Sequence, residues 1–300
     1  MSTDLLPDAS TGARRTARHY FLLTKPRIIE LLLVTTVPAM VIADGGWPGT
    51  WLVAATLLGG AMSAGSANAI NNVIDRDVDR LMRRTSNRPS ARDEIGPRQA
   101  LTFGIVLGIA GLAWLTAFVN LTAALLATSA ILFYVFVYTL GLKRRTPQAV
   151  VIGGAAGCVP VLTGWAAVPG ASLADPRPWL LFALIFWWTP PHFWALAMKY
   201  RDDYARAGLP MMPVAHGNQA TARQVLLYSY LLLAVVLLYF AGARAGLVFL
   251  AGGVGLTVGW LVLAHALNRD PTVRRAMRLF HYSTSYLALV FLVAAVDAVV

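Results

Sequence analysis

The sequence contains nine separate runs of apolar residues, each about as long as an α-helix needs to be to cross a lipid bilayer. Roughly 17 to 25 mainly apolar residues span a hydrocarbon core of ~30 Å. The runs cover residues 28–43, 51–74, 99–118, 121–141, 149–168, 179–198, 224–242, 246–267 and 279–300. Of the 300 residues, 57% are hydrophobic and only 13% are charged, which excludes a soluble domain with a polar surface. We therefore expect an all-α polytopic membrane protein, a bundle of about nine transmembrane helices.

The spacing of the runs predicts one membrane-embedded domain, residues 28–300, after a polar cytoplasmic segment, residues 1–27. Two runs meet at Asn120 with almost no polar spacer. If they formed one continuous span, the helix count would fall to eight. The single cysteine, Cys158, lies inside an apolar run, so a disulfide framework is excluded and we expect a small core residue.

The basic residues gather on one predicted side of the membrane. Five precede the first run, seven follow the second, three follow the fourth, four follow the sixth and four follow the eighth. Only Arg177 and Arg244 remain for the other side. This distribution satisfies the positive-inside rule if the N-terminus is cytoplasmic. The net charge of +11 therefore reflects topology, and we do not expect nucleic-acid binding.

The acidic residues include two short clusters on that same side. They are Asp75, Asp77 and Asp79 after the second run, and Asp202 and Asp203 after the sixth. The i, i+4, i+8 spacing of Asn71, Asp75 and Asp79 places them on one helix face if the helix continues past the membrane, with Asp77 opposite. Oxygen atoms in such a column, about 6 Å apart along the axis, suit Mg²⁺, which prefers oxygen ligands and is often shared with substrate phosphates. The second cluster could supply the other half of a site.

The alternative interpretation is a solvated helix end with local ion pairs, such as Asp79 with Arg83. Charged loops of this kind are common. Two acidic clusters after even-numbered runs favour a site instead, and so do Asn68, Asn71 and Asn72, because an amide inside a span needs a partner.

The motif NxxxDxxxD at Asn71, Asp75 and Asp79, on a nine-span chain with a second acidic loop, resembles the UbiA-type intramembrane prenyltransferases. Five strings are similar to the haem-farnesylating branch of that family: LTKPRII (23–29), DRDVDRLMRRTSNRP (75–89), LKRRTPQAVVIGGAAG (142–157), TPPHFWALAMKYRDDYARAGLPMMPV (189–214) and FHYSTSYLALVFL (280–292). The resemblance covers nearly all of the chain beyond residue 20. It implies a UbiA-type fold in a bacterial cell membrane, with the active site toward the cytoplasm.

The resemblance also implies an activity. It is the Mg²⁺-dependent transfer of a farnesyl group from farnesyl diphosphate to a vinyl group of haem B, with addition of water, to give haem O. A diphosphate departs only if its developing charge is neutralised, and metal ions with Lys or Arg side chains do this. Pathway logic adds a haem A synthase or a terminal oxidase as a possible partner, and membrane lipid surrounds the chain.

The candidate Mg²⁺ ligands are Asn71, Asp75, Asp79 and Asp203, with Asp202 as a further catalytic candidate. Candidate diphosphate-binding residues are Lys25, Arg83, Arg84, Arg88, Lys143, Arg144, Lys199, Tyr200, Arg201 and Tyr204. Many relatives carry DxxxD as the second motif, whereas this chain has YRDDY. Adjacent aspartates on a helix point about 100° apart, so we expect Asp203 to bind the metal directly and Asp202 to act through water or a cation.

His192, inside the sixth run, is the candidate haem-binding residue. A lone membrane histidine is more often a hydrogen-bonded packing residue, but imidazole is also a common axial ligand of haem iron. Trp187 and Trp188 belong to an aromatic belt or stack on the porphyrin. The small residues of GGAMSAGSANA (59–69) and GGAAG (153–157) predict close helix packing around the farnesyl chain.

Two other functions remain open. A different UbiA-type enzyme, acting on an aromatic acid, a quinone precursor or a chlorophyll-like ring, would share the acidic site, and only the strings at 142–157 and 189–214 argue against it. A transporter would carry ionisable groups near the bilayer midplane and an internal repeat of its spans. Here the acids lie at the cytoplasmic edge and no repeat is evident, so a transporter is the least favoured.

Overall fold

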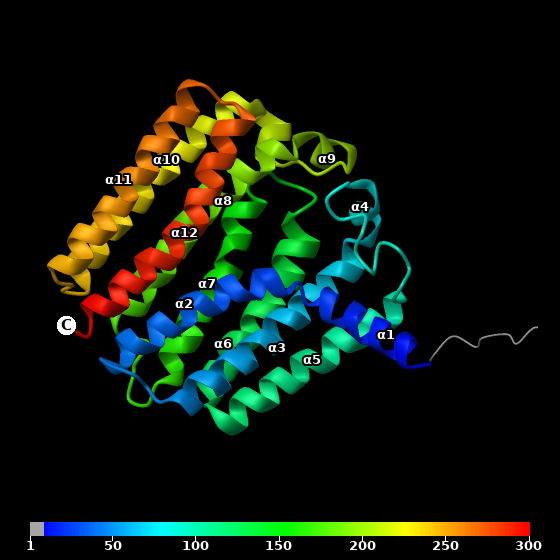
Figure 1. Cartoon of the computed structure of the whole chain (residues 1–300), viewed down its shortest axis with the longest axis horizontal. Helices are drawn as coiled ribbons and strands as arrows, with labels where there is room; N and C mark the ends of the chain where they lie inside the picture. The colour runs from blue at the N-terminus through cyan, green and yellow to red at the C-terminus, as the bar shows by residue number, and fades with distance from the viewer. Residues whose placement is uncertain (1–8) are drawn as a thin grey trace, which may run out of the picture.

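The computed structural model describes residues 9–300, without the side chains of residues 9–13, 27, 28 and 30–33. The described residues form helices and no strands (Figure 1). The helices are α1 (Ala9–Leu23), α2 (Pro26–Asp44), α3 (Thr50–Ile74), α4 (Arg76–Leu81), α5 (Pro97–Phe118), α6 (Leu121–Leu132), the π-helix η1 (Phe133–Leu142), α7 (Ala149–Ala167), α8 (Pro176–Lys199), α9 (Arg201–Arg206), α10 (Met212–Gly242), α11 (Leu247–Arg269) and α12 (Val273–Asp297).

Each predicted run lies in helical structure except for at most three residues at one end, with the run at 121–141 divided between α6 and η1, so the all-α membrane fold is confirmed. Within the described residues, eight helices are long and apolar enough to cross a membrane: α3, α5, α6 continued by η1, α7, α8, α10, α11 and α12. The remaining predicted span, the run at 28–43, corresponds to α2, whose described apolar part, Val34–Asp44, is shorter than a span. The two runs at Asn120 are separate helices, because its Oδ1 accepts from the Ala123 N–H at 2.8 Å and caps α6.

The helices pack as a closed ring. Each long helix contacts the next along the chain, from α2 through α3, α5, α6, α7, α8, α10 and α11 to α12, and α12 contacts α2. α2 also packs against α7, and α12 also packs against α8. The short helices α4 and α9 lie at one end of the bundle, and the C-terminus lies at the opposite end (Figure 1).

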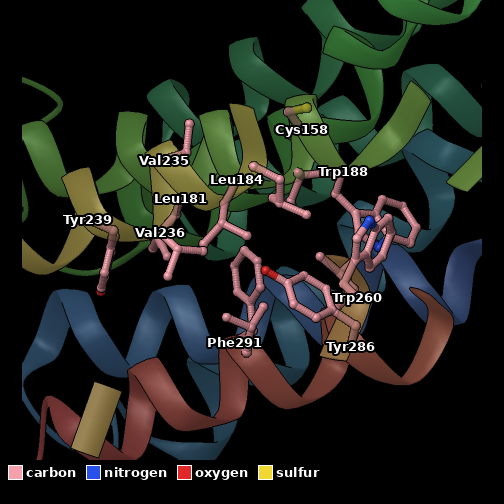
Figure 2. Close-up of a cluster of buried hydrophobic side chains, with 14 of the residues drawn as sticks. Cys158, Leu181, Leu184, Trp188, Val235, Val236, Tyr239, Trp260, Tyr286 and Phe291 are labelled. Carbon is pink, nitrogen blue, oxygen red and sulfur yellow. The ribbon is translucent and has the colours of Figure 1, made fainter. Parts of the chain in front are cut away.

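The largest buried core joins α2, α7 and α8 to the three last helices (Figure 2). Three of its aromatic side chains, those of Trp188, Trp260 and Tyr286, bond their polar atoms within the core, as burial favours. The Trp260 indole N–H donates to Ser229 Oγ at 2.7 Å, and the Tyr286 and Thr257 hydroxyls are 2.9 Å apart. Cys158 is fully buried, as predicted.

Small residues bring neighbouring helices close, as the sequence predicted. A Cβ atom at Gly59 would lie 2.4 Å from Leu115 Cγ, and one at Gly104 would lie 2.8 Å from Ile70 Cγ1. Both contacts lie between α3 and α5, so the lack of a side chain at these glycines lets the two helices pack closely. On α7, a Cβ at Gly153 would lie 2.2 Å from a ring carbon of Tyr138.

Three features of the fold were missed by hydropathy. The predicted polar N-terminal segment contains α1, and residues 1–8 of that segment lie outside the described residues. α10 and α12 begin 12 and 6 residues before the apolar runs at 224–242 and 279–300, because their first turns are polar. η1 has π geometry, with the Lys143 N–H donating to the Tyr138 carbonyl five residues earlier.

Candidate active site

The first acidic motif lies where α3 ends. Asp75 has φ −92° and ψ 8° and joins α3 to α4, yet its N–H donates to the Asn71 carbonyl at 2.9 Å and its own carbonyl accepts from the Asp79 N–H at 2.7 Å. The i, i+4 register therefore continues through the bend. Asn71, Asp75 and Asp79 are 2%, 0% and 3% exposed, whereas the Asp77 side chain is 65% exposed. Burial of these carboxylates does not fit the alternative of a solvated helix end.

Asn71 is the centre of a hydrogen-bond network. Its Nδ2 donates to Asp75 Oδ2 at 2.7 Å and to Thr139 Oγ1 at 3.1 Å, and its Oδ1 accepts from Lys25 Nζ at 2.7 Å. The Thr139 hydroxyl donates in turn to the Tyr134 carbonyl at 2.8 Å. The network fixes which end of the amide faces which partner. Sequence reasoning missed Thr139, since a threonine in an apolar run carries no signal of its own.

Basic side chains from the end of η1 reach this motif. Lys143 Nζ pairs with Asp75 Oδ2, and Arg144 Nη2 lies 3.8 Å from Asp75 Oδ1. Arg144 also donates two hydrogen bonds of 2.7 Å to the Asp77 carboxylate. These bonds hold the pKa of Asp77 below its ordinary value. The predicted Lys143 and Arg144 thus lie beside the first motif.

The second motif lies on α9. Asp203 is 7% exposed and pairs with Arg206. The Arg84 backbone N–H approaches Asp203 Oδ2 at 3.4 Å, while its guanidinium approaches the Tyr204 hydroxyl at 3.4 Å and lies over the Tyr200 ring at 5.5 Å. The segment after α4 therefore contacts α9 and the residue that precedes it.

A small apolar cluster joins the two motifs. Val78 and Met82, from α4 and the residue after it, are buried with Tyr204, Leu209 and Met211, from α9 and the segment that follows. α4 and α9 are accordingly neighbours at one end of the bundle (Figure 1). The two acidic clusters, more than 120 residues apart in sequence, are brought to the same place.

The carboxylates are balanced by cations. Asp79 Oδ2 accepts from Arg88 at 2.6 Å, as Asp75 pairs with Lys143 and Asp203 with Arg206. Within residues 9–300, no three His, Cys, Asp or Glu side chains converge into a group that could hold a metal ion without other ligands. Asp75 Oδ1, however, is buried and accepts no hydrogen bond from any described residue, although Arg144 lies 3.8 Å away. A buried carboxylate oxygen without a hydrogen bond, together with the side-chain oxygens of Asn71 and Asp79, is the kind of donor set that Mg²⁺ uses.

Lys25 reaches the first motif from the turn between α1 and α2. Desolvation by burial, together with the nearby charges of Arg88 and Lys143, lowers the pKa of Lys25 well below its ordinary value, although Asp79 and Asp75 oppose this effect. An anion bound beside the amino group would favour its charged form. Lys25 is thus a predicted residue that the fold does bring to the motif.

Other predicted residues lie at the edge of the site. Arg83, Arg201 and Asp202 are exposed, and their side chains make no ion pair or hydrogen bond to any described residue. Lys199 is exposed as well, with its Nζ 5.5 Å from the Tyr200 ring centroid. Asp202 and Asp203 diverge as expected for adjacent residues of a helix, with only Asp203 buried.

His192 lies in α8 between two aromatic rings. Its imidazole stacks on Trp188 at 4.2 Å between centroids and lies 4.7 Å from Phe280. Nδ1 contacts Ser283 Oγ, and that hydroxyl donates to the Phe280 carbonyl at 2.6 Å. In the arrangement where the hydroxyl proton stays with the carbonyl, Nδ1 carries the hydrogen of the neutral imidazole and Nε2 keeps its lone pair. Nε2 has no hydrogen-bond partner among the described residues.

The sequence is similar to a group of bacterial enzymes. Proteins named protoheme IX farnesyltransferase from Clavibacter sepedonicus and Frankia alni are each 52% identical to this chain. The matches cover 95% of this chain and 94% of the Clavibacter protein, and 94% of this chain and 98% of the Frankia protein. A protein named protoheme IX farnesyltransferase 1 from Saccharopolyspora erythraea is 51% identical over 98% of this chain and 94% of its own length.

The fold is similar to solved structures of more distant sequence. A structure described as digeranylgeranylglyceryl phosphate synthase in membranes has a TM-score of 0.77 at 17% identity, covering 95% of this chain and 99% of that one. A UbiA homologue from Archaeoglobus fulgidus bound to DMAPP and Mg²⁺ has a TM-score of 0.68 at 21% identity, covering 92% and 99%.

The profile of the UbiA prenyltransferase family matches residues 32–292. That match covers most of the chain, and relatives with about half of their residues identical extend over nearly all of it. The chain belongs to the UbiA prenyltransferase family.

Proposed function

We propose that this protein transfers the farnesyl group of farnesyl diphosphate to a vinyl group of haem B and so makes haem O. The names of relatives that are 51–52% identical support this acceptor and this donor. The observation that carries the proposal is the meeting of two buried acidic motifs with Lys25, Arg88 and Lys143 at one end of an apolar bundle. Such an arrangement suits the anionic head of a prenyl diphosphate.

The reaction balances without a redox partner. The bond between farnesyl C1 and the diphosphate oxygen breaks, and the diphosphate leaves with the electron pair. The terminal vinyl carbon of haem bonds to C1, and the inner vinyl carbon takes a hydroxyl from water, which releases one proton. The product carries a hydroxyethylfarnesyl group where the vinyl group was.

The basic side chains bind and orient the diphosphate. Lys25, Lys143 and Arg88 each already donate to the first motif, so they lie within one side-chain length of any anion held there. Arg84 lies on the side of the second motif. Ammonium and guanidinium groups fixed in place stabilise the charge that grows on the departing oxygens, since they need no reorganisation.

Asn71, Asp75, Asp79 and Asp203 are the residues that would hold Mg²⁺. Bound Mg²⁺ would neutralise the diphosphate and make it a better leaving group. Asp75 Oδ1 supplies a buried carboxylate oxygen that lacks a hydrogen-bond partner among the described residues. The Mg²⁺ in the UbiA homologue from Archaeoglobus fulgidus, which has the same fold, supports this assignment.

The acceptor is proposed to lie along α8, deeper in the membrane. His192 precedes Tyr200 by eight residues, which is about 12 Å along a helix axis. Its free Nε2 suits haem iron, and hydrogen bonding at Nδ1 is the usual way that proteins orient a ligating imidazole. The buried Trp188 ring stacks on the imidazole and makes its surroundings apolar. An apolar cavity here would keep water from the farnesyl cation until the vinyl carbon attacks.

The orientation in the membrane follows from charge. We propose that residues 28–300 form one catalytic domain in a bacterial cell membrane, with the N-terminus and both motifs on the cytoplasmic side. All the basic residues except Arg177 and Arg244 lie in segments at the same end as the motifs, as the positive-inside rule requires.

The test is conversion of haem B by the purified full-length protein in detergent or lipid. Farnesyl diphosphate and haem B are supplied with Mg²⁺ or with a chelator, beside an aromatic acid and a quinone precursor as control acceptors, and products are weighed by mass spectrometry. We expect haem B to gain the mass of one farnesyl group and one hydroxyl group only when Mg²⁺ is present. Prenylation of a control acceptor with no haem product would overturn the haem assignment.

A further inference from the structure

The turn between α1 and α2 rests on one strip of α3. Asn68 Nδ2 donates to the Thr24 carbonyl at 2.9 Å, and Asn72 Nδ2 donates to the Leu23 carbonyl at 2.8 Å. Gly65, one turn earlier, leaves room for the turn, because a Cβ there would lie 3.2 Å from Thr24 Cβ. Asn68 and Asn72 are only 5% and 1% exposed. The last carbonyls of α1, which helix geometry leaves without partners, are thus bonded by side chains of a membrane span.

This contact sets the backbone of the next residue. Lys25 has φ 53° and ψ 61°, the left-handed conformation that a residue with a Cβ rarely adopts. Such strain persists only where the surroundings over-determine the backbone, and it is concentrated at functional sites. Here the surroundings are the two bonded carbonyls before Lys25 and the first turn of α2 after it, which begins at Pro26.

The strained residue is the one that reaches the first acidic motif. Lys25 Nζ donates to Asn71 Oδ1 at 2.7 Å, and Asn71 lies between Asn68 and Asn72 on α3. The three asparagines therefore bind consecutive groups of one short segment, two through its carbonyls and one through its amino group. Packing of α1 against α3 does not by itself require these three bonds, because Leu23 is fully buried against Ala69 and already supplies apolar contact.

We propose that Asn68 and Asn72 are positioning residues that act through Lys25: they hold the turn so that the Lys25 amino group lies at the end of the site that binds diphosphate. The proposal rests on the proposed function for the identity of the ligand. It distinguishes Asn68 and Asn72, which bind main-chain carbonyls, from Asn71, a candidate metal ligand. It also gives a role to the two buried amides, whose Nδ2 groups are bonded although Asn72 Oδ1 accepts no hydrogen bond from any described residue.

The test is a double-mutant cycle in the affinity for farnesyl diphosphate with Mg²⁺ and no acceptor, measured by calorimetry on the purified full-length protein. We expect Asn68→Leu and Asn72→Leu each to weaken binding about tenfold, the equivalent of ~1.4 kcal/mol, and Lys25→Met to weaken it at least as much. When either leucine substitution is added to Lys25→Met, the affinity should change less than twofold. The reason is that the effects of residues that act through one group are not additive. Ser66→Ala, a buried change on α3 that faces α5, is the matched control and should leave the affinity unchanged.

The proposal is overturned if the leucine variants bind farnesyl diphosphate as tightly as the unaltered protein. It is also overturned if the leucine substitutions weaken binding as much in the Lys25→Met background as they do alone. If the leucine variants do not fold, Asn68→Ser and Asn72→Ser enter the same cycle.

If the unaltered protein binds no farnesyl diphosphate, the proposed function fails, and a second measurement then decides the positioning role. In Lys25→Cys, thiol labelling reports on the turn, because the native Cys158 is fully buried. Faster labelling after Asn68→Leu supports the positioning role, and an unchanged rate overturns it.

Discussion

Asp175 and Arg177 form an ion pair at the end of the bundle opposite the acidic motifs. Asp175 caps α8 by accepting from the Arg177 N–H at 2.8 Å, and the Arg177 guanidinium donates to the same carboxylate at 2.7 to 3.1 Å. These bonds hold the pKa of Asp175 below its ordinary value. A carboxyl group whose pKa is lower in the folded than in the unfolded protein stabilises the fold at pH values above its unfolded-state pKa, which is about 4 for aspartate. This stabilisation is lost as the pH falls through the folded-state pKa.

Asp175→Asn should therefore destabilise the protein in a pH-dependent way. Asparagine keeps an oxygen for the cap but loses the charge, so we expect a loss of about 1 kcal/mol at pH 7 that shrinks as the pH is lowered toward 2. Thermal unfolding in detergent across this range measures it. Asp270→Asn, which removes a looser pair of 3.4 Å with Arg275, is the control and should have a smaller effect. An equal loss from Asp175→Asn at both pH values would contradict the assignment.

At this scale the sequence predicted which carboxylates share a helix face but not which cation binds each of them. The i, i+4 spacing was enough to separate Asp75 and Asp79 from Asp77, because helix geometry is local. The partner of Asp79 is Arg88 rather than Arg83, the partner in the solvated-end alternative. The pairing of Asp79 with Arg88 depends on how the segment after α4 folds back on itself. Hydrogen bonds from Arg80 to the Ala91 carbonyl and to the Asp93 carboxylate hold that fold.

Among the elements, η1 and α7 show how helix packing shapes the site. η1 places Thr139 beside Asn71 and is followed directly by Lys143, and it packs against α7 where Gly153 meets the Tyr138 ring. The sequence predicted the close packing from GGAAG, because small residues are a pattern. It could not predict the π geometry, whose signature is a hydrogen-bond register rather than a residue type.

Gly153→Ala should thus destabilise the protein, whereas Gly157→Ala, one turn later on α7, should not. The added methyl at position 153 would lie 2.2 Å from a Tyr138 ring carbon, while the one at position 157 would meet no atom within 4 Å. Overpacking of this kind costs typically 1–3 kcal/mol, and alanine is up to about 1 kcal/mol better than glycine within a helix. Thermal unfolding of the two variants compares them directly. Equal shifts for both would refute the packing argument.

For the whole molecule, the closed ring of helices is what the sequence could not supply. Hydropathy placed the spans and the positive-inside rule placed both acidic clusters on one side, because each depends on local composition. The contact of α12 with α2, and the apolar cluster that joins α4 to α9, depend on packing between segments far apart in the chain. Only the fold shows that the two motifs are neighbours.

The central claim is that the buried carboxylates of the first motif act on the diphosphate through Mg²⁺. Asp75→Asn and Asp77→Asn test it as a matched pair, since both remove one charge from the same segment but only Asp75 is buried in the network around Asn71. The measurement is the initial rate of Mg²⁺-dependent diphosphate release from farnesyl diphosphate, with haem B present, across a range of Mg²⁺ concentrations. We predict that Asp75→Asn slows it by about 100-fold or more, as loss of a group that stabilises leaving-group charge does, while Asp77→Asn stays near the unaltered rate. Equal rates in the two variants would contradict the account.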